Sequence, residues 1–215
     1  SAYDELMAFQ RQTEALGQID GRLGWDQETM MPDGAAGQRA EEFAAMESVL
    51  HARKTHPQIG EWLSKIDAST LDPVSAANVR HISRSFERSQ RVPAKLAEAI
   101  AKLSSSAQRI WADAREKEDV AAFLPALEEM IALKRDEASA LAQGGDAYDA
   151  LLDDYEPDTS GEDVAATFAA MRPRLVALRD KVMGAEQPPE LKFEFDEQKQ
   201  MRLARSLAKI FGYDM

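Results

Sequence analysis

Apolar residues recur every three or four positions along most of the chain, and this period predicts a succession of amphipathic helices. The first apolar stripe extends from Leu6 to Leu23. A second helix is expected over residues 36–54, and Pro57 is expected to begin a short third one, because proline fits the first turn of a helix. The positions expected to face inward in the second helix are Ala40, Phe43, Val49 and Leu50.

Proline and aspartate mark the start and stop of the next helices. Asp72 followed by Pro73 combines an N-cap residue with proline at the first helical position, which indicates a helix start. Pro93 disfavours helical geometry in the residue before it, so this helix should end near Arg91. Pro93 can itself begin the following helix, whose unbroken apolar stripe ends near Lys117 and predicts one of the longest helices of the chain.

Three further helices are expected in the second half of the chain. One should start near Pro125 and stop at the glycine pair that begins at Gly144. Another follows a capping sequence at Ser160 and contains Pro173, which predicts a kink because proline removes a backbone donor. The last should cover about residues 197–211.

The period changes over residues 191–195, where Leu191, Phe193 and Phe195 alternate with charged residues as in a half-buried strand. The expected fold class is therefore all-α, an elongated multi-helix bundle with long antiparallel helices and at most one short strand near residues 191–195. Residues 187–189, Gln-Pro-Pro, are the expected domain boundary.

Composition narrows the class of protein. The chain has 215 residues, of which 44% are hydrophobic and 30% charged, as in a globular protein with a substantial core. The net charge of −12 argues against nucleic acid as the main partner. No run approaches the ~20 apolar residues of a membrane span, so no membrane partner is expected. The absence of cysteine rules out disulfides and thiolate zinc sites and fits a cytoplasmic protein.

Two segments, residues 25–32 and residues 148–157, combine aromatic and acidic residues too densely for ordinary linkers. In the structural interpretation Trp25 and Met31 are buried and fix the turn between the first two helices, Asp26 or Thr29 is a cap, and Pro32 stops the helix. In the second segment the carboxylates would cap or pair, and buried surface would come from Tyr148, Leu151, Leu152 and Tyr155. In the functional interpretation the segments line a groove. The candidate residues are Trp25, Asp26, Glu28, Thr29, Met31, Tyr148, Asp149, Asp153, Tyr155 and Glu156.

Residues for metal-dependent or nucleophilic catalysis do not form a pattern in this sequence. The histidines, His51, His56 and His81, form no His-Glu-x-x-His motif, in which two imidazoles converge on one ion from successive turns. His51 and His56 are separated by the expected helix end at Pro57. There is no cysteine and no Gly-x-Ser-x-Gly sequence. We therefore assign no catalytic and no metal-binding residue.

Five basic residues recur at three- and four-residue steps and form a positive stripe on an acidic chain. One hypothesis is a solvated face that pairs with Glu87, Glu98 and acidic neighbours. The other is attraction of an anionic group, such as the terminal carboxylate of a peptide. The stripe consists of Arg80, Arg84, Arg88, Arg91 and Lys95.

The two dense segments together resemble the carboxypeptidase Taq family of helical zinc metallocarboxypeptidases. Residues 25–32, Trp-Asp-Gln-Glu-Thr-Met-Met-Pro, are similar to the family's Trp-Asp-x-x-Thr-x-Met-Pro segment. Residues 148–157 are similar to its Tyr-Asp-x-Leu-Leu-Asp-x-Tyr-Glu-Pro segment. Residues 86–96 and 211–214 also look like family stretches, in the expected order.

The resemblance implies the N-terminal half of an enzyme that removes C-terminal residues from peptides with broad specificity. Zinc or another divalent metal would be bound beyond this chain, so the isolated chain is expected to hold no metal and to be inactive. Residues 1–186 would form a wall of the substrate groove, and residues 187–215 would begin the catalytic half. The resemblance also implies a homodimer. The alternative is a non-catalytic helical scaffold or interaction domain.

Overall fold

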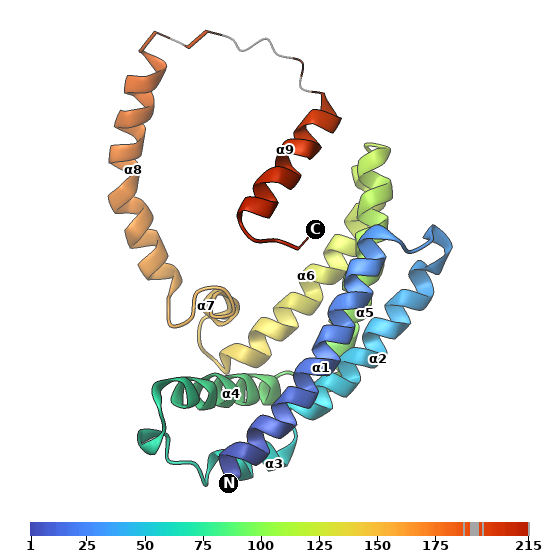
Figure 1. Cartoon of the computed structure of the whole chain (residues 1–215), viewed down its shortest axis with the longest axis vertical. Coiled ribbons are helices and arrows are strands. Elements are labelled where there is room, and N and C mark those ends of the chain that lie inside the picture. Colours follow the sequence, from blue (N-terminus) through green and yellow to red (C-terminus); the bar gives the residue numbers. More distant parts are fainter. Residues whose placement is uncertain (187, 190–193, 195, 215) are drawn as a thin grey trace. The chain divides into compact units, whose positions relative to one another are not determined.

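The computed structural model describes residues 1–186, 188–189, 194 and 196–214, and Figure 1 shows that helices dominate the chain. The predicted all-α fold class is confirmed. The strand predicted over residues 191–195 lies outside the described residues. The chain divides into two compact units, Ser1–Asp163 and Val164–Met215. The domain boundary expected at residues 187–189 stays a prediction.

The helices in chain order have bounds close to those that the sequence predicts. A short 3-10 turn at Asp33–Ala35 lies between the first two helices, and another at Ala68–Thr70 lies between the third and the fourth. The helices are α1 (Ala2–Thr29), α2 (Ala36–Lys54), α3 (Pro57–Leu63), α4 (Pro73–Arg91), α5 (Ala94–Glu116), α6 (Val120–Ala142), α7 (Ala147–Leu152), α8 (Gly161–Met183) and α9 (Glu197–Ile210).

The local signals for helix ends are confirmed at several positions. The Asp72 carboxylate accepts hydrogen bonds from the amides of Val74 and Ser75 at 3.0 and 3.2 Å, and Pro73 occupies the first turn of α4. Helix α6 ends at Gln143, a residue with left-handed geometry, and Gly144 follows with φ of 95°. The Ser160 and Asp163 side chains bond each other's backbone amides at the start of α8.

One predicted boundary was wrong. Helix α6 starts at Val120, not near Pro125, because the Asp119 side chain caps it by accepting the Ala122 amide at 3.1 Å. Helix α1 continues through the first dense segment to Thr29 and ends before Pro32, the residue that the structural interpretation gives as its stop. Pro173 lies within the continuous helix α8.

In the unit Ser1–Asp163, α2 packs most extensively on α5, and α5 packs on α6 (Figure 1). Helix α1 lies along α2, while α3 joins α1 to α4. Ala40 and Leu50 face the interior as predicted, but Val49 is exposed. These contacts place the end of α1 beside α5, and α7 beside α6.

An apolar cluster forms where α1, α3 and α4 meet. Leu6 and Ile59 are fully buried, and Trp62 is 8% exposed. The Trp62 indole Nε1 donates to Glu5 Oε2 at 2.8 Å, so its polar edge is satisfied. Other apolar side chains packed on the cluster are Ala2, Phe9, Leu63, Ile66, Ile82 and Phe86.

The unit Val164–Met215 contains most of α8 and all of α9, and both helices expose apolar side chains. The stripe predicted for α8 exists as a face of the helix. Its exposed members are Phe168, Met171, Leu175, Leu178 and Val182. In α9 and the residues after it, Met201, Leu203, Leu207, Ile210 and Phe211 are exposed.

The cluster at Leu6 gives a stability prediction. Leu6→Ala should lower the free energy of unfolding by about 2–5 kcal/mol, since it leaves a cavity in a fully buried site. Leu124→Ala is the matched control, because Leu124 is 44% exposed and its loss should cost less than about 1 kcal/mol. Urea unfolding followed by circular dichroism measures both, and equal losses would contradict the assigned core.

Candidate functional site

The first dense segment forms the last turns of α1 and the start of the loop to α2. Trp25 is 62% exposed and Met31 is half-buried, so the prediction that both are buried was wrong for Trp25. Since α1 continues through this segment, its helical geometry places Trp25 on an outer face. Thr29 does not cap a neighbouring helix, because its hydroxyl donates to the Trp25 carbonyl at 2.6 Å.

Asp26 holds the end of α1 against α2. Its carboxylate pairs with Arg39 at 2.5 Å, and a second Arg39 nitrogen donates to the Leu23 carbonyl. Arg39 Nε also donates to Glu42 at 2.8 Å. The Arg39 residue is only 9% exposed, and its hydrogen bond with Asp26 raises the pKa of this arginine. Asp26 therefore has a structural role as the partner of a buried cation.

The end of α1 also reaches α5 through polar contacts. Ser105 donates to Gln27 at 2.6 Å, and Gln108 donates to Glu28 at 2.8 Å. Arg109 pairs with Asp33 of the loop at 2.6 Å. Together these contacts line a hollow of about 240 Å³, to which Glu28, Thr29 and Met31 contribute and Trp25 and Asp26 do not.

The second dense segment contains α7 and the turn after it. The Asp146 side chain caps α7 by accepting the amides of Tyr148 and Asp149 at 2.8 and 2.9 Å. Asp149 in turn accepts the Gly161 amide at 2.7 Å. A Cβ atom at Gly161 would lie 3.2 Å from the Asp149 carboxylate and 3.3 Å from the Tyr148 ring, so this close approach favours glycine.

The aromatic residues of this segment do not supply buried surface. Tyr148 is 66% exposed and Tyr155 is 83% exposed, so that expectation was wrong. Glu156 is exposed as well. The apolar contribution comes from the half-buried Leu151 and Leu152, because α7 is short and turns one face toward its neighbours.

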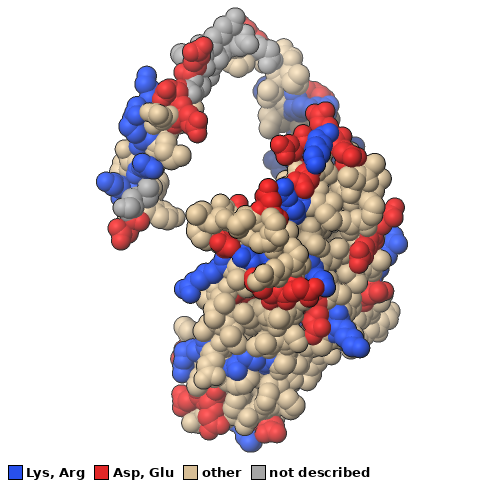
Figure 2. Space-filling model, turned by 90° about the vertical axis from the view of Figure 1, so that its right-hand side faces the viewer, with Lys and Arg blue, Asp and Glu red and all other residues tan. Residues whose placement is uncertain are grey.

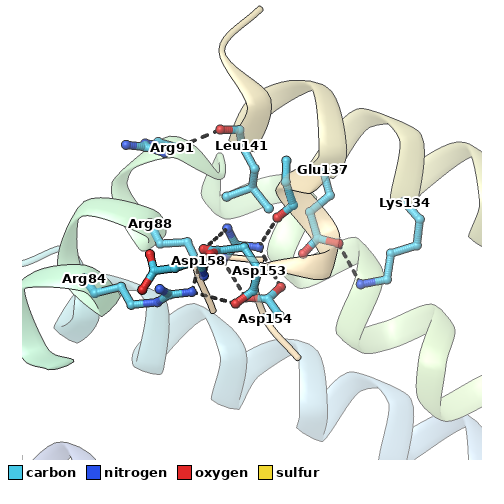
Figure 3. A network of polar contacts seen from close by, with 10 residues as sticks. Arg84, Arg88, Arg91, Lys134, Glu137, Leu141, Asp153, Asp154 and Asp158 are labelled. Carbon is cyan, nitrogen blue, oxygen red and sulfur yellow. Dashed lines mark hydrogen bonds and ion pairs between the residues drawn. The ribbon is translucent and has the colours of Figure 1, made fainter. Parts of the chain in front are cut away.

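Asp153 and Asp154 dock this segment on α4 (Figure 3). Arg84 pairs with Asp153 Oδ2 at 2.5 Å and donates to the Asp153 carbonyl at 2.6 Å. Arg88 bonds both Asp154 oxygens, at 2.6 and 2.7 Å, and donates to the Ala150 carbonyl at 2.7 Å. The bidentate geometry is the stronger form of arginine–carboxylate pairing.

These contacts change the ionisation of Asp153. Burial alone raises the pKa of a carboxyl group, but the Asp158 amide and the guanidinium groups of Arg84 and Arg88 outweigh it. The pKa of Asp153 therefore lies below its ordinary value, and the carboxylate is ionised at neutral pH.

The basic stripe divides into two kinds of residue. Arg84 and Arg88 pair with acidic neighbours, as the first hypothesis predicts, and these neighbours are Asp153 and Asp154. The other stripe residues on α4, Arg80 and Arg91, have few polar partners. All the arginines of the stripe line a hollow of about 500 Å³, and Asp153 also contributes to its lining.

The histidines do not form a metal site. His51 Nε2 lies 2.7 Å from the Val92 carbonyl, so this nitrogen carries the proton. His56 caps α3, and His81 is exposed on α4. In the described part of the chain, no three His, Cys, Asp or Glu side chains are grouped to hold a metal ion. The metal that the resemblance implies does not fit these residues.

The two dense segments line separate hollows that share no residue. Sequence reasoning missed the α5 side chains of the first hollow, Ser105, Gln108 and Arg109, because no local pattern links residues that are 76 to 80 positions apart. Across the described residues, no helix is long and apolar enough to cross a membrane.

The fold is all-helical, and comparison with known proteins shows that the chain belongs to a class of metallopeptidase. Residues 5–215 match the family described as carboxypeptidase Taq (M32) metallopeptidase, so the chain belongs to this family. Thermostable carboxypeptidase 1 of Thermus thermophilus is 37% identical over the whole of this chain, which covers 45% of that relative. The chain thus spans less than half the length of this curated relative.

Solved structures agree with this assignment. The Trypanosoma cruzi metallocarboxypeptidase 1 structure is 30% identical, with a TM-score of 0.75 over 99% of this chain and 44% of its own. The crystal structure of BsuCP gives a TM-score of 0.85 at 22% identity, over 99% of this chain and 43% of its own. The second likeness supports the fold alone.

The buried cation Arg39 gives a second prediction. Asp26→Asn should lower the free energy of unfolding by about 1–2 kcal/mol, because it removes the ionic partner of a largely buried guanidinium. Glu41→Gln is the control, since Glu41 pairs with Lys102 on the surface and should cost less than about 0.5 kcal/mol. Chemical unfolding of both variants checks this, and equal losses would contradict the role of Asp26.

The lowered pKa of Asp153 gives a prediction about pH. A carboxyl group whose pKa is lower in the folded state stabilises it above the unfolded pKa, about 4, and loses this effect as pH falls through the folded pKa. The stability difference between the chain and Asp153→Asn should therefore be full above about pH 5 and shrink below about pH 4.

Glu156→Gln is the control for this titration, because it removes the same charge from an exposed side chain of the same segment. Unfolding by urea at a series of pH values measures the three proteins. A stability difference for Asp153→Asn that is independent of pH would show that the ion pairs with Arg84 and Arg88 do not form.

Proposed function

We propose that this chain is the N-terminal part of a metallocarboxypeptidase that hydrolyses C-terminal residues from peptides with broad specificity. The observation that carries the proposal is the family match over residues 5–215, which contains both dense segments in family order. Peptide substrates follow from the names and family of the relatives.

The metal ligands and the catalytic base belong, in this proposal, to a part of the protein outside these 215 residues. Zinc is the proposed metal, from the resemblance to zinc metallocarboxypeptidases. The support is the length of the Thermus relative, of which this chain covers 45%. The isolated chain is proposed to be inactive, and no step of the reaction is assigned to its own residues.

The role proposed for residues 1–186 is a wall of the substrate groove, with residues 187–215 beginning the catalytic half. Among the candidate residues, Glu28, Thr29 and Met31 line a hollow and suit a groove-lining role. Asp26, Asp149 and Asp153 suit structural roles, since their carboxylates bond neighbouring segments. On the basis of the resemblance we also propose a homodimer, and the lack of cysteine supports a cytoplasmic location.

A non-catalytic scaffold is the second candidate. The observation that favours it is the exposed apolar surface of α8 and α9, which includes Phe168 and Leu207. In that case the exposed apolar faces of α8 and α9 would bind another protein and hydrolyse nothing.

Metal content and turnover separate the two candidates. The complete protein that contains this chain should hydrolyse a blocked dipeptide, lose activity with a chelator and regain it with zinc. The 215-residue chain, dialysed and analysed for metal, should hold no stoichiometric metal and show no turnover. A complete protein without activity would favour the scaffold, and a 215-residue chain that turns over substrate with bound zinc would contradict the assignment of the metal site elsewhere.

A further inference from the structure

The hollow along α4 contains two arginines without an acidic partner. The Arg80 side chain makes no hydrogen bond or ion pair with any residue that the structure describes. Arg91 makes one hydrogen bond, at 3.5 Å, to the Leu141 carbonyl, and Figure 3 shows it directed away from Asp153 and Asp154. Both are exposed, so their charges are available to a ligand.

The arginines between them are already neutralised. Arg84 and Arg88 donate to Asp153, Asp154 and two main-chain carbonyls, and the lowered pKa of Asp153 keeps that partner charged at neutral pH. Glu87 also lines the middle of the hollow, with its carboxylate accepting from the Ser83 hydroxyl at 2.9 Å. The hollow is therefore positive at its ends and neutral to acidic in its middle.

Spacing along the helix sets the size of the ligand. Arg80 and Arg91 are eleven residues apart, which is about 16 Å along α4. Their positions differ by about 20° around the helix axis, so both lie on the same face. A small anion cannot reach both residues. An extended peptide advances about 3.3 Å per residue, so carboxylates four residues apart are separated by about 13 Å on one side of the peptide.

We propose that the α4 hollow binds an extended acidic peptide segment through Arg80 and Arg91, with two carboxylates about four residues apart and an uncharged stretch opposite Glu87. The charge of the rest of the chain argues for binding of a specific peptide and against binding of anions in general. The chain is acidic overall, and Figure 2 shows Lys and Arg side chains lying among Asp and Glu on the face presented, so a general attraction of anions is not expected.

The claim that the hollow is a subsite for peptide substrates rests on the proposed function. The claim that the hollow binds an acidic peptide does not depend on that function. A binding experiment on the 215-residue chain therefore separates the two proposals, because turnover is not needed for the readout.

The test uses a dye-labelled peptide, Ala-Glu-Ala-Ala-Ala-Glu-Ala, and fluorescence anisotropy at low ionic strength. Arg80→Gln and Arg91→Gln should each weaken binding about threefold, and together about tenfold, as expected for exposed charge pairs. Raising the salt concentration should weaken binding by the unsubstituted chain. Circular dichroism confirms that each variant keeps its helices.

Two controls keep the change in charge or the peptide charge the same but alter where the charge lies. Arg22→Gln removes an exposed cation of α1 that has no partner among the described residues, and it should leave binding unchanged. A peptide with the same two glutamates adjacent to each other should bind more weakly. Undetectable binding, an equal loss in Arg22→Gln, or equal affinity for the adjacent-glutamate peptide would overturn the proposal.

Discussion

Arginine side chains that bond both a main-chain carbonyl and a side chain of one neighbouring segment hold these helices in place. Arg39 bonds the Leu23 carbonyl and Asp26 of α1, and Arg53 bonds the Phe9 carbonyl and Thr13 at 2.9 Å each. A guanidinium has five donors in a fixed planar arrangement, so one side chain can satisfy both acceptors. Apolar stripes bring the helices together, and these bonds fix their position along and around one another.

Helix α7 is an element whose position depends on such arginine bonds. It has six residues, too few for a helix that is stable by itself, and its last carbonyls lack partners within the helix. Arg84 and Arg88 of α4 supply donors to the Asp153 and Ala150 carbonyls and ion pairs to the adjacent carboxylates. The shape of the second dense segment therefore depends on a helix more than 60 residues earlier.

Local signals were enough to predict most helix bounds, because caps and prolines act within a few residues. The start of α4 at Pro73 follows from such a signal, since Asp72 caps the helix. The start of α6 was missed because Pro125 by itself predicts the first turn of a helix. The helix is instead capped by Asp119 and contains Pro125. The exposure of Trp25 was not predictable, since hydrophobicity alone does not say which face of a helix end meets a neighbour. Acidic partners of the basic stripe were expected, but Asp153 and Asp154 could not be named as those partners, because long-range pairs leave no local pattern.

The exposed apolar residues have a common physical meaning. Apolar surface left in water costs about 25 cal/mol per Å² relative to burial, and α8 exposes a full stripe that includes Phe168 and Leu175. A helix with one apolar stripe is amphipathic, and such a stripe normally packs against another surface. The described residues of the unit Val164–Met215 leave this stripe of α8 exposed.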